Sequence, residues 1–347
     1  MSAIEAKSQA QALAFAPFSF QAAMALRDLG ILEVLGSVRR PGLPLPELAE
    51  RAGVSEYGVS VLLDFGEHLG LVEGEEGRWA LGKVGYFFLH DEMTRVNADF
   101  THDICYDALR YLTRAVRTGQ PAGLSSLGPW DTLYQGLSSL PEPARSSWFN
   151  FDHLYSDRVF SDLLPLVFDR PVQQLLDVGG NTGRWARCCL EYSPDVHVTM
   201  VDLPVQLERA AEEMKAAGWT ERVEYHAADL LSDQSRLPAG ADVIWMSQFL
   251  DCFSADQIVS ILRRARQVMG GEARLFIIEL FPDRQAFDAA AFSLDATSLY
   301  FTCVANGNSR MYRYAEFARL LEAAGLEVVQ EWDGVGVGHT ALYCRPV

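Results

Sequence analysis

The stretch Leu175-Leu-Asp-Val-Gly-Gly-Asn-Thr-Gly183 decides the fold of this chain. It begins as an apolar run typical of a buried strand, and a helical pattern over residues 184–192 follows it directly. In a doubly wound sheet, ligands bind where strand ends meet helix N-termini, and glycines there let a ligand approach the backbone. Gly179, Gly180 and Gly183 therefore predict a ligand-binding turn.

Short apolar runs and helical patterns continue to alternate after this turn, which is typical of a parallel sheet with helices on both faces. We therefore predict an α/β fold with a Rossmann-like, doubly wound sheet. The final two runs lie close together in sequence and predict an antiparallel edge hairpin. The predicted strands are residues 174–178, 197–201, 222–226, 243–246, 275–279, 327–332 and 340–344, and the predicted helices are 184–192, 205–217, 255–268 and 314–324.

The glycine spacing differs from the dinucleotide fingerprint, since Asn181 and Ala186 interrupt it, and NAD is therefore the second choice of cofactor. Asp202 directly follows the second predicted strand, about twenty residues after the glycine turn. At this place a carboxylate can accept both hydroxyls of a ribose. The third ends near Asp229. Either acid can instead cap a helix. Together they favour a nucleoside without a phosphate.

The first part of the chain has a winged-helix pattern. Residues 8–36 predict one helix. The segment 45–55 predicts a helix, a glycine turn and a new N-cap, and another helix follows over 57–69. Residues 71–81 alternate around a glycine-rich acidic turn, as a two-stranded wing does. Residues 93–168 are mostly helical and predict a connector that lines a pocket.

Charge argues against a nucleic-acid or membrane partner. The chain has 29 Lys+Arg and 46 Asp+Glu, a net charge of −17, and phosphate backbones and anionic lipids repel such a protein. The predicted recognition helix, residues 56–68, carries Asp64 and Glu67 without a Lys or Arg. We therefore expect the winged helix to serve dimerisation or substrate enclosure.

Other patterns bear on location and metal binding. We find no signal peptide and no apolar run of the 18 residues or more that a membrane span needs. The six cysteines form no C-x-x-C pair, which predicts reduced thiols in the cytoplasm. There is no H-E-x-x-H motif, and we expect no metal.

The order of four motifs, Asp177-Val-Gly-Gly-Asn-Thr-Gly183, Val201-Asp-Leu-Pro204, Ala228-Asp-Leu230 and Ile278-Glu-Leu-Phe-Pro282, behind a winged-helix pattern resembles one family. This is the family of class I S-adenosylmethionine-dependent small-molecule O-methyltransferases, which includes plant caffeate and acetylserotonin O-methyltransferases and bacterial tailoring enzymes. The resemblance covers nearly the whole chain. It implies S-adenosylmethionine as cofactor and S-adenosylhomocysteine as product.

The resemblance also implies an organisation and a cofactor site. Residues 1–92 would form a winged-helix-like dimerisation domain that contributes to the pocket of the partner in a homodimer, 93–168 the connector that lines the substrate pocket, and 169–347 the catalytic domain. The glycines would flank the methionine part of the cofactor, Asp202 would hold the ribose, and Asp229 would lie at the adenine. The full implied set is Asp177, Gly179, Gly180, Gly183, Asp202, Leu203, Asp229, Leu230, Met246 and Ser247.

The chain departs from the family at the catalytic base. The family follows its fourth strand with Val-Leu-His-Asp-Trp, whose His removes the proton from the acceptor hydroxyl. Here Asp251 stands in the place of that His, with Cys252 and Phe253 behind it. Glu279 matches the acid that orients the base, but residues 308–313 lack the second such acid.

Three roles are open to Asp251. Burial beside Glu279 can raise its pKa from about 3.9 toward neutrality and make it a base. It can instead orient the acceptor as a hydrogen-bond acceptor or counter-charge. It can also be structural, in an enzyme that relies on proximity alone.

Further residues are candidates for the acceptor site. His153 can replace the missing base or be an ordinary helical histidine, and Asp295 can line the pocket or make a structural hydrogen bond. Aromatic residues suit a planar substrate. The predicted substrate pocket is Trp148, Phe149, Phe249, Asp295 and Tyr300.

We expect methylation of a small phenolic or other aromatic metabolite in a biosynthetic tailoring pathway, with O-methylation first. The alternatives are C-methylation ortho to a phenol, N-methylation, and a non-catalytic regulator that binds the cofactor.

Overall fold

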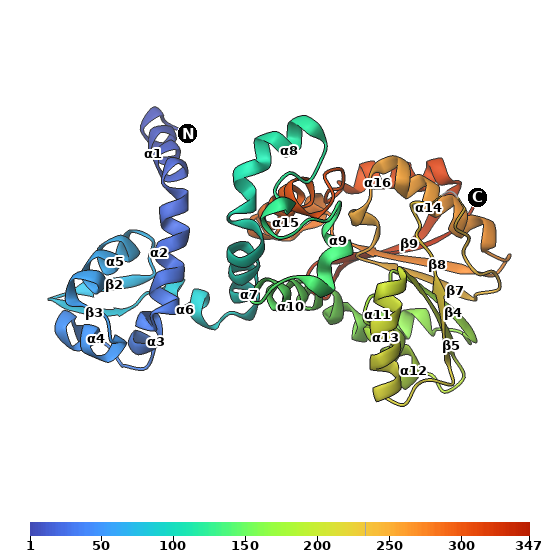
Figure 1. Ribbon diagram of the computed structural model, residues 1–347, viewed down its shortest axis with the longest axis horizontal. Coiled ribbons are helices and arrows are strands. Elements are labelled where there is room, and N and C mark those ends of the chain that lie inside the picture. Colours follow the sequence, from blue (N-terminus) through green and yellow to red (C-terminus); the bar gives the residue numbers. More distant parts are fainter. Residues whose placement is uncertain (233) are drawn as a thin grey trace. The chain divides into compact units, whose positions relative to one another are not determined.

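The computed structural model describes residues 1–232 and 234–347, which form two compact units, Met1–Thr101 and His102–Val347 (Figure 1). Residues between Ala23 and Leu89 of the first unit form one apolar core that includes Leu26, Leu32 and Leu63. Within the described residues, no helix is long and apolar enough to cross a membrane.

The first unit has the predicted wing, because strands β2 and β3 pair antiparallel from Val72 opposite Leu81. The single helix predicted over residues 8–36 is wrong. Pro17 opens a second helix after a break at Phe15, and Gly30, at φ 71°, separates the second from the third. The elements are α1 (Ala3–Ala14), α2 (Ala16–Asp28), α3 (Ile31–Gly36), β1 (Leu43–Pro44), α4 (Leu45–Ala52), α5 (Glu56–His68), β2 (Val72–Glu75), β3 (Arg78–Leu81), α6 (Lys83–His90) and α7 (Glu92–Phe100).

Short helices continue the chain before the large sheet, as the sequence predicts for residues 93–168. They are η1 (Thr101–Cys105), η2 (Ala108–Tyr111), α8 (Leu112–Thr118), η3 (Leu124–Ser126), α9 (Leu133–Gly136), η4 (Leu137–Ser139), α10 (Ala144–Ser156), η5 (Asp157–Val159) and α11 (Phe160–Val167).

A seven-stranded sheet forms the centre of the second unit, in the order β6-β5-β4-β7-β8-β10-β9. Strands β4 to β8 are parallel, and β10 and β9 form the predicted antiparallel hairpin, with β9 at the edge. The elements are β4 (Gln174–Val178), α12 (Arg184–Tyr192), β5 (His197–Asp202), α13 (Pro204–Ala216), β6 (Val223–Ala227), β7 (Val243–Ser247), η6 (Leu250–Cys252), α14 (Ala255–Val268), β8 (Arg274–Glu279), η7 (Pro282–Arg284), α15 (Asp288–Tyr300), η8 (Phe301–Ala305), α16 (Tyr314–Ala324), β9 (Leu326–Val335) and β10 (His339–Pro346).

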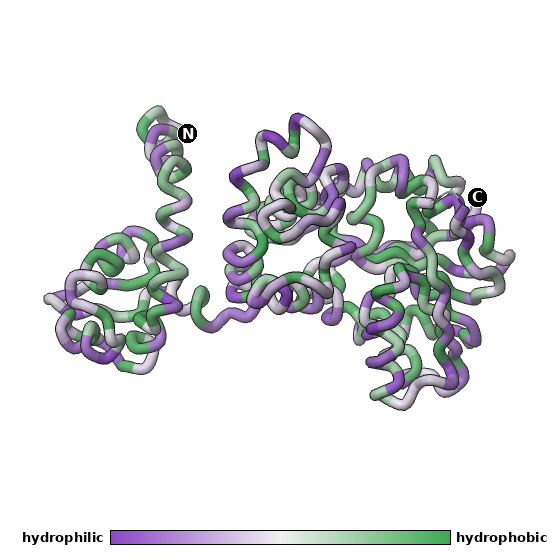
Figure 2. The backbone as a smooth tube through the Cα atoms, in the orientation of Figure 1, coloured by the Kyte–Doolittle hydropathy of each residue, from purple (hydrophilic) through white to green (hydrophobic). Residues whose placement is uncertain are grey.

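Helices cover both faces of this sheet, so its central strands are hydrophobic along their length (Figure 2). Every residue of β8 is buried. On one face Trp185 of α12 stacks on Trp245 of β7 with ring centroids 3.8 Å apart. The predicted α/β class and the doubly wound sheet are confirmed.

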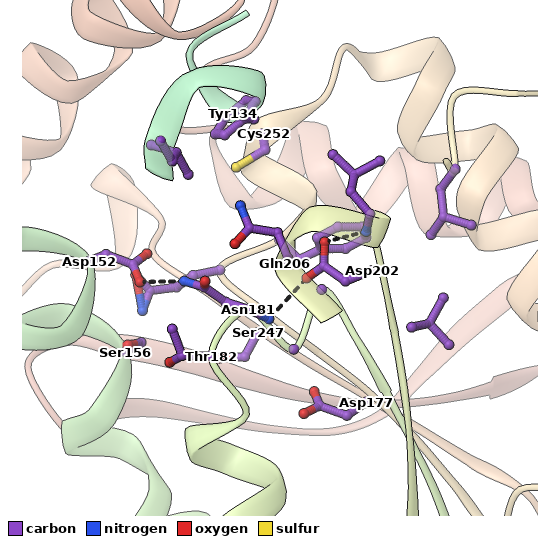
Figure 3. A pocket seen from close by; sticks show the side chains of 18 of the residues that line it. Tyr134, Asp152, Ser156, Asp177, Asn181, Thr182, Asp202, Gln206, Ser247 and Cys252 are labelled. Atoms are coloured by element: carbon purple, nitrogen blue, oxygen red, sulfur yellow. Dashed lines mark hydrogen bonds between the residues drawn. The ribbon is translucent and has the colours of Figure 1, made fainter. Parts of the chain in front are cut away.

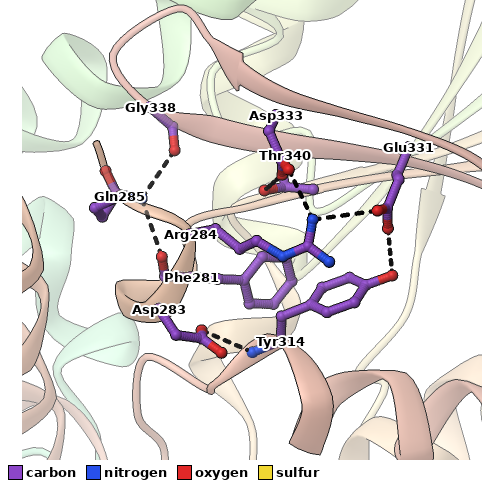
Figure 4. A network of polar contacts seen from close by, with 9 residues as sticks. All are labelled: Phe281, Asp283, Arg284, Gln285, Tyr314, Glu331, Asp333, Gly338 and Thr340. Atoms are coloured by element: carbon purple, nitrogen blue, oxygen red, sulfur yellow. Dashed lines mark hydrogen bonds and ion pairs between the residues drawn. The ribbon is translucent and has the colours of Figure 1, made fainter.

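A polar network ties the edge hairpin to the segment that follows β8 (Figure 4). The Nη1 atom of Arg284 donates to the carboxylate of Asp333 at 2.7 Å, and its guanidinium lies 3.7 Å above the ring of Tyr314. The Nε2 atom of Gln285 donates to the carbonyl of Gly338 at 2.9 Å. These contacts hold the start of α15 against the hairpin.

Candidate active site

A cavity of about 420 Å³ opens at the carboxyl ends of β4, β5 and β7, where the sequence predicts the ligand site (Figure 3). Helices α9 and α10 provide its opposite wall through Tyr134, Trp148 and Asp152. The cavity therefore lies between the glycine turn of the sheet and the helices that precede it.

The glycines of the turn after β4 have no room for a side chain. Gly179 has φ 77°, and a Cβ placed on it would lie 2.3 Å from the ring of Phe249. A Cβ on Gly180 would lie 2.8 Å from Oδ2 of Asp177. Gly183, with φ 82°, is the N-cap of α12. Gly179 and Gly180 thus bring bare backbone to the cavity wall.

Asp202 is held by the backbone at the end of β5. Its Oδ2 accepts a hydrogen bond from the amide of Asn181 at 2.9 Å, and its Oδ1 accepts one from the amide of Leu203 at 2.7 Å. Burial raises the pKa of Asp202, and these two hydrogen bonds oppose that rise. The carboxylate is therefore oriented beside the glycine turn, where a ribose hydroxyl can reach it.

Most of the cofactor set implied by the resemblance gathers at this cavity. Gly183 and Met246 do not belong to its wall. The Met246 side chain, on β7, is fully buried in the core of the sheet. Asp229 lies at the wall, and its Oδ1 also accepts the amide of Leu231 at 2.9 Å. The members that line the cavity are Asp177, Gly179, Gly180, Asp202, Leu203, Asp229, Leu230 and Ser247.

Six residues of this wall each have a buried polar atom without a hydrogen-bond partner among the described residues: Oη of Tyr134, Oδ2 of Asp177, Oδ1 of Asn181, Nε1 of Trp185, Oγ of Ser247 and Nε2 of Gln248. Such atoms are costly to bury unless a ligand or water bonds them. A polar nucleoside with an amino-acid tail supplies partners, so the residues present fit S-adenosylmethionine. In the same described residues, no group of three or more His, Cys, Asp and Glu side chains is placed to hold a metal ion.

Asp251, which stands in the place of the missing base, and Glu279 lie behind the cavity wall. Cys252 and Phe253 line the cavity, whereas Asp251 and Glu279 are not part of its wall and are 6% and 2% exposed. The Cys252 thiol donates to Oδ1 of Asp251 at 3.5 Å. Burial raises the pKa of Asp251 to about 6.

Glu279 supports the same segment from β8. Its Oε1 accepts hydrogen bonds from the amides of Leu250 at 2.8 Å and Phe249 at 3.2 Å. Burial, and then the charge of Asp251, raise the pKa of Glu279 well above its usual range. Oε1 of Glu279 therefore holds the start of η6 through two backbone hydrogen bonds.

His153 lies at the cavity wall on α10. Burial, and then the nearby charge of Arg184, lower the pKa of His153 to about 4, so its imidazole is neutral at pH 7. The residue before it, Asp152, lines the same cavity and was missed by the sequence analysis. The sequence held one signal for it: Asp152 follows the predicted pocket residue Trp148 by four positions, and residues four apart lie on the same face of a helix.

The predicted aromatic pocket is only partly assembled. Trp148 and Phe249 line the cavity, and Nε1 of Trp148 donates to the hydroxyl of Tyr300 at 2.8 Å. Phe149 packs under the guanidinium of Arg209, 4.3 Å from its ring centroid. Asp295 instead pairs with Arg313 at 2.9 Å on the surface.

Tyr134 is a second wall residue that sequence reasoning did not single out for a role. It enters from α9, and its ring lies next to Cys252 (Figure 3). Burial raises the pKa of Tyr134 well above its usual range. It came from a four-residue helix too short to show periodicity.

Comparisons with known proteins agree with this geometry. Residues 156–327 match the O-methyltransferase domain family, and residues 7–79 match the Dimerisation2-like domain. The chain is 27% identical over 288 residues to the 3-hydroxy-5-methyl-1-naphthoate 3-O-methyltransferase of Streptomyces sahachiroi, across 82% of this chain and 80% of that protein. It is 22% identical over 328 residues to the L-tyrosine C(3)-methyltransferase of Streptomyces lavendulae, across 93% and 88%.

Among solved structures, the S-adenosylmethionine-dependent methyltransferase SibL in its apo form superposes with a TM-score of 0.74 at 27% identity, across 98% of this chain and 99% of that one. The matched catalytic region contains the glycine turn, Asp202 and Glu279. The chain therefore belongs to the S-adenosylmethionine-dependent small-molecule O-methyltransferase family, and it is a methyltransferase with the class I fold.

Proposed function

We propose that this enzyme methylates a phenolic oxygen of a small, planar aromatic metabolite in a biosynthetic tailoring pathway. The observation that carries this proposal is the composition of the cavity. Aromatic side chains and carboxyl groups line the same cavity as the glycine turn and Asp202. The named naphthoate methyltransferase relative, which acts on an aromatic acid by its name, supports the substrate class.

The chain's own residues would act by binding, orientation and exclusion of water. S-adenosylmethionine, when bound, supplies an activated methyl group on a sulfonium. Asp202 would hold its ribose, and Trp148 and Phe249 would confine the acceptor ring. Holding a nucleophile in line with the transferring methyl in a dry site supplies a large part of the rate.

C-methylation ortho to a phenol is the second candidate. It is supported by Asp251, which replaces the family's histidine, and by the relative that is an L-tyrosine C(3)-methyltransferase. A carbon nucleophile needs electron density pushed into the ring and a group that later takes the ring proton. Carboxyl groups near the acceptor suit both steps.

The proposed assembly is a homodimer formed through the first unit. Every residue of α1 is exposed, and large apolar side chains including Leu13 (77% exposed) and Phe18 (64%) lie on α1 and α2. An apolar helix surface of this kind is typical of an interface. The match of residues 7–79 to a dimerisation domain supports it. The division at residues 92 and 168, and the cytoplasmic location, stay predictions.

The test is binding followed by transfer. Calorimetry would measure the affinity for S-adenosylmethionine, S-adenosylhomocysteine and NAD, and labelled-methyl transfer would follow into phenols, hydroxybenzoates, hydroxynaphthoates and aromatic amino acids. NMR of the product gives the methylated atom. We expect binding of the first two ligands only and a methyl ether as product. A methyl group on a ring carbon would favour the second candidate, and binding without transfer to any acceptor would overturn the proposal.

A further inference from the structure

Asp152 is a carboxyl group that faces the cavity. It lies on α10, and its side chain is 28% exposed. Asp152 lines the cavity, so the exposed part of the side chain faces the cavity. Its Oδ2 accepts a hydrogen bond from Nδ2 of Asn181 at 3.0 Å. Within residues 1–232 and 234–347, Oδ1 has no hydrogen-bond donor, so it can accept one from a bound molecule.

Asn181 joins Asp152 to the cofactor end of the cavity. Its backbone amide donates to Asp202 at 2.9 Å while its side chain donates to Asp152, so one residue orients both carboxyl groups (Figure 3). Asn181 has φ 46°, in the left-handed region. This backbone conformation costs about 1 kcal/mol or more in a residue other than glycine, and the two hydrogen bonds offset it.

Asp251 has a different position. Its Oδ1 accepts a hydrogen bond from the Cys252 thiol, and Asp251 is 6% exposed. Cys252 lines the cavity, whereas Asp251 does not. A molecule in the cavity touches Cys252 before it can touch Asp251. The residue at the place of the family's histidine is therefore not the carboxyl group that an acceptor would meet.

We propose that Asp152, and not Asp251, is the base that contacts the acceptor hydroxyl, and that Asn181 holds it in register with the cofactor site. This inference rests on the proposed function. Asp251 is then a positioning residue that acts through Cys252 and the η6 segment.

The electrostatic surroundings of Asp152 suit this role. Burial raises the pKa of Asp152 to about 7, with further upward contributions from Asp157 of η5 and Asp251 of η6. The Asn181 hydrogen bond and the charge of Arg184 on α12 oppose the rise. Its other titratable neighbours are His153, neutral at pH 7, and Tyr300 of α15. A base with a pKa near the working pH transfers protons efficiently.

The step balances with groups that the site and the proposed reaction supply. The acceptor oxygen forms its bond to the methyl carbon as the S–CH₃ bond breaks, and the hydroxyl proton passes to the Asp152 carboxylate. The positive sulfonium and the negative carboxylate become a neutral thioether and a neutral carboxylic acid. A later exchange with water returns the proton to solvent.

The test compares Asp152→Asn with Asp251→Asn in the full-length enzyme. Asparagine keeps an oxygen that can accept from Asn181 but cannot take a proton at this pH. We expect Asp152→Asn to lower kcat about 10²–10⁴-fold and to abolish the inflection near pH 7 in kcat/KM. Asp251→Asn should lower kcat by at most about tenfold and keep the inflection. Asp195→Asn, in the exposed loop between α12 and β5, is the control.

Two readouts do not depend on turnover. We expect the calorimetric Kd of S-adenosylhomocysteine to be unchanged in Asp152→Asn. A large rise would mean that Asp152 holds the cofactor instead, and would overturn the inference. We also expect ¹³C NMR of labelled aspartate, assigned by loss of one signal in Asp152→Asn, to show that carboxyl group titrating near pH 7 in the complex with S-adenosylhomocysteine. Titration below pH 5 would overturn the inference as well.

These outcomes separate the inference from the proposed function. A wild-type enzyme that binds no S-adenosylmethionine contradicts the proposed function. A wild-type enzyme that transfers methyl groups while Asp152→Asn keeps its full rate contradicts only the role of Asp152.

Discussion

Asp177 and Asp202 lie near the ends of two paired parallel strands, but within the described residues only the Asp202 carboxylate accepts backbone amides. Oδ2 of Asp177 has no partner there. Burial, and then the charge of Asp202, raise the pKa of Asp177 to about 8. Two neighbouring acids thus differ in their surroundings: two backbone amides orient the Asp202 carboxylate, whereas burial favours the neutral form of Asp177.

Asp202→Ala should weaken binding of S-adenosylmethionine. The change removes the proposed ribose contact and the anchor of the Asn181 amide. Loss of hydrogen bonds to a charged group corresponds to about 1.5–3 kcal/mol, or about 10–100-fold in Kd. Calorimetry measures this, with Asp195→Ala as the control. An unchanged Kd would show that the ribose lies elsewhere.

Gly179→Ala should damage the site more than Gly218→Ala. Both glycines have positive φ, 77° and 82°, so both changes carry the same backbone strain of about 1–2 kcal/mol. The Cβ at Gly179 would lie 2.3 Å from the Phe249 ring, whereas at Gly218 it points into open space. We expect a lower melting temperature for both variants and weaker cofactor binding for Gly179→Ala alone. Equal effects on binding would contradict the close approach at this turn.

Asp177→Asn should gain stability relative to the wild type as the pH rises. The pKa of Asp177 is about 8 in the folded protein and about 3.9 unfolded, so its stabilising contribution is complete below about pH 4 and is lost as the pH rises toward 8. Asparagine does not ionise. The difference in melting temperature between the variant and the wild type should therefore grow from pH 5 to pH 8 in the ligand-free protein, and that of Asp195→Asn should stay flat. A difference for Asp177→Asn that does not change with pH would show that this carboxyl group is ionised when folded.

Glu279→Gln should retain most activity, and Glu279→Ala should not. Burial raises the pKa of Glu279 well above its usual range, which favours the uncharged form that glutamine mimics, and glutamine preserves the oxygen that accepts the amides of Leu250 and Phe249. Alanine leaves these buried amides without a partner, at a cost of about 1–3 kcal/mol each. Melting curves and methyl-transfer rates would test the pair. A glutamine variant as inactive as the alanine variant would mean that the negative charge itself is needed.

Phe18→Glu should dissociate the proposed homodimer, because it places a charge on the apolar surface of α1 and α2. Light scattering after size exclusion would report the mass. Val329→Glu, at an apolar position of the edge strand β9 that is 44% exposed, is the matched control in the second unit. A wild-type monomer, or a Phe18→Glu dimer, would count against this interface.

The sequence alone determined the α/β class and the position of the glycine turn. Strand β4 is found at the predicted residues 174–178, and the wing pairs as its alternation predicted. These features depend on short-range patterns: strand periodicity, and glycines where a helix follows a strand. The prediction of one helix over residues 8–36 was wrong. The apolar periodicity continues across Pro17 and Gly30, but the chain forms separate helices on either side of these residues.

The tertiary structure decided which acids face the cavity. Asp251, chosen by its place in the motif, lies behind Cys252, and Asp152, which was not chosen, faces the cavity. Asp295 pairs with Arg313 on the surface. The physical reason is that the orientation of a side chain depends on how its helix is rotated against the sheet. The packing of α10 and η6 against the rest of the unit sets that rotation. A short sequence motif of one strand and one turn does not specify such long-range packing.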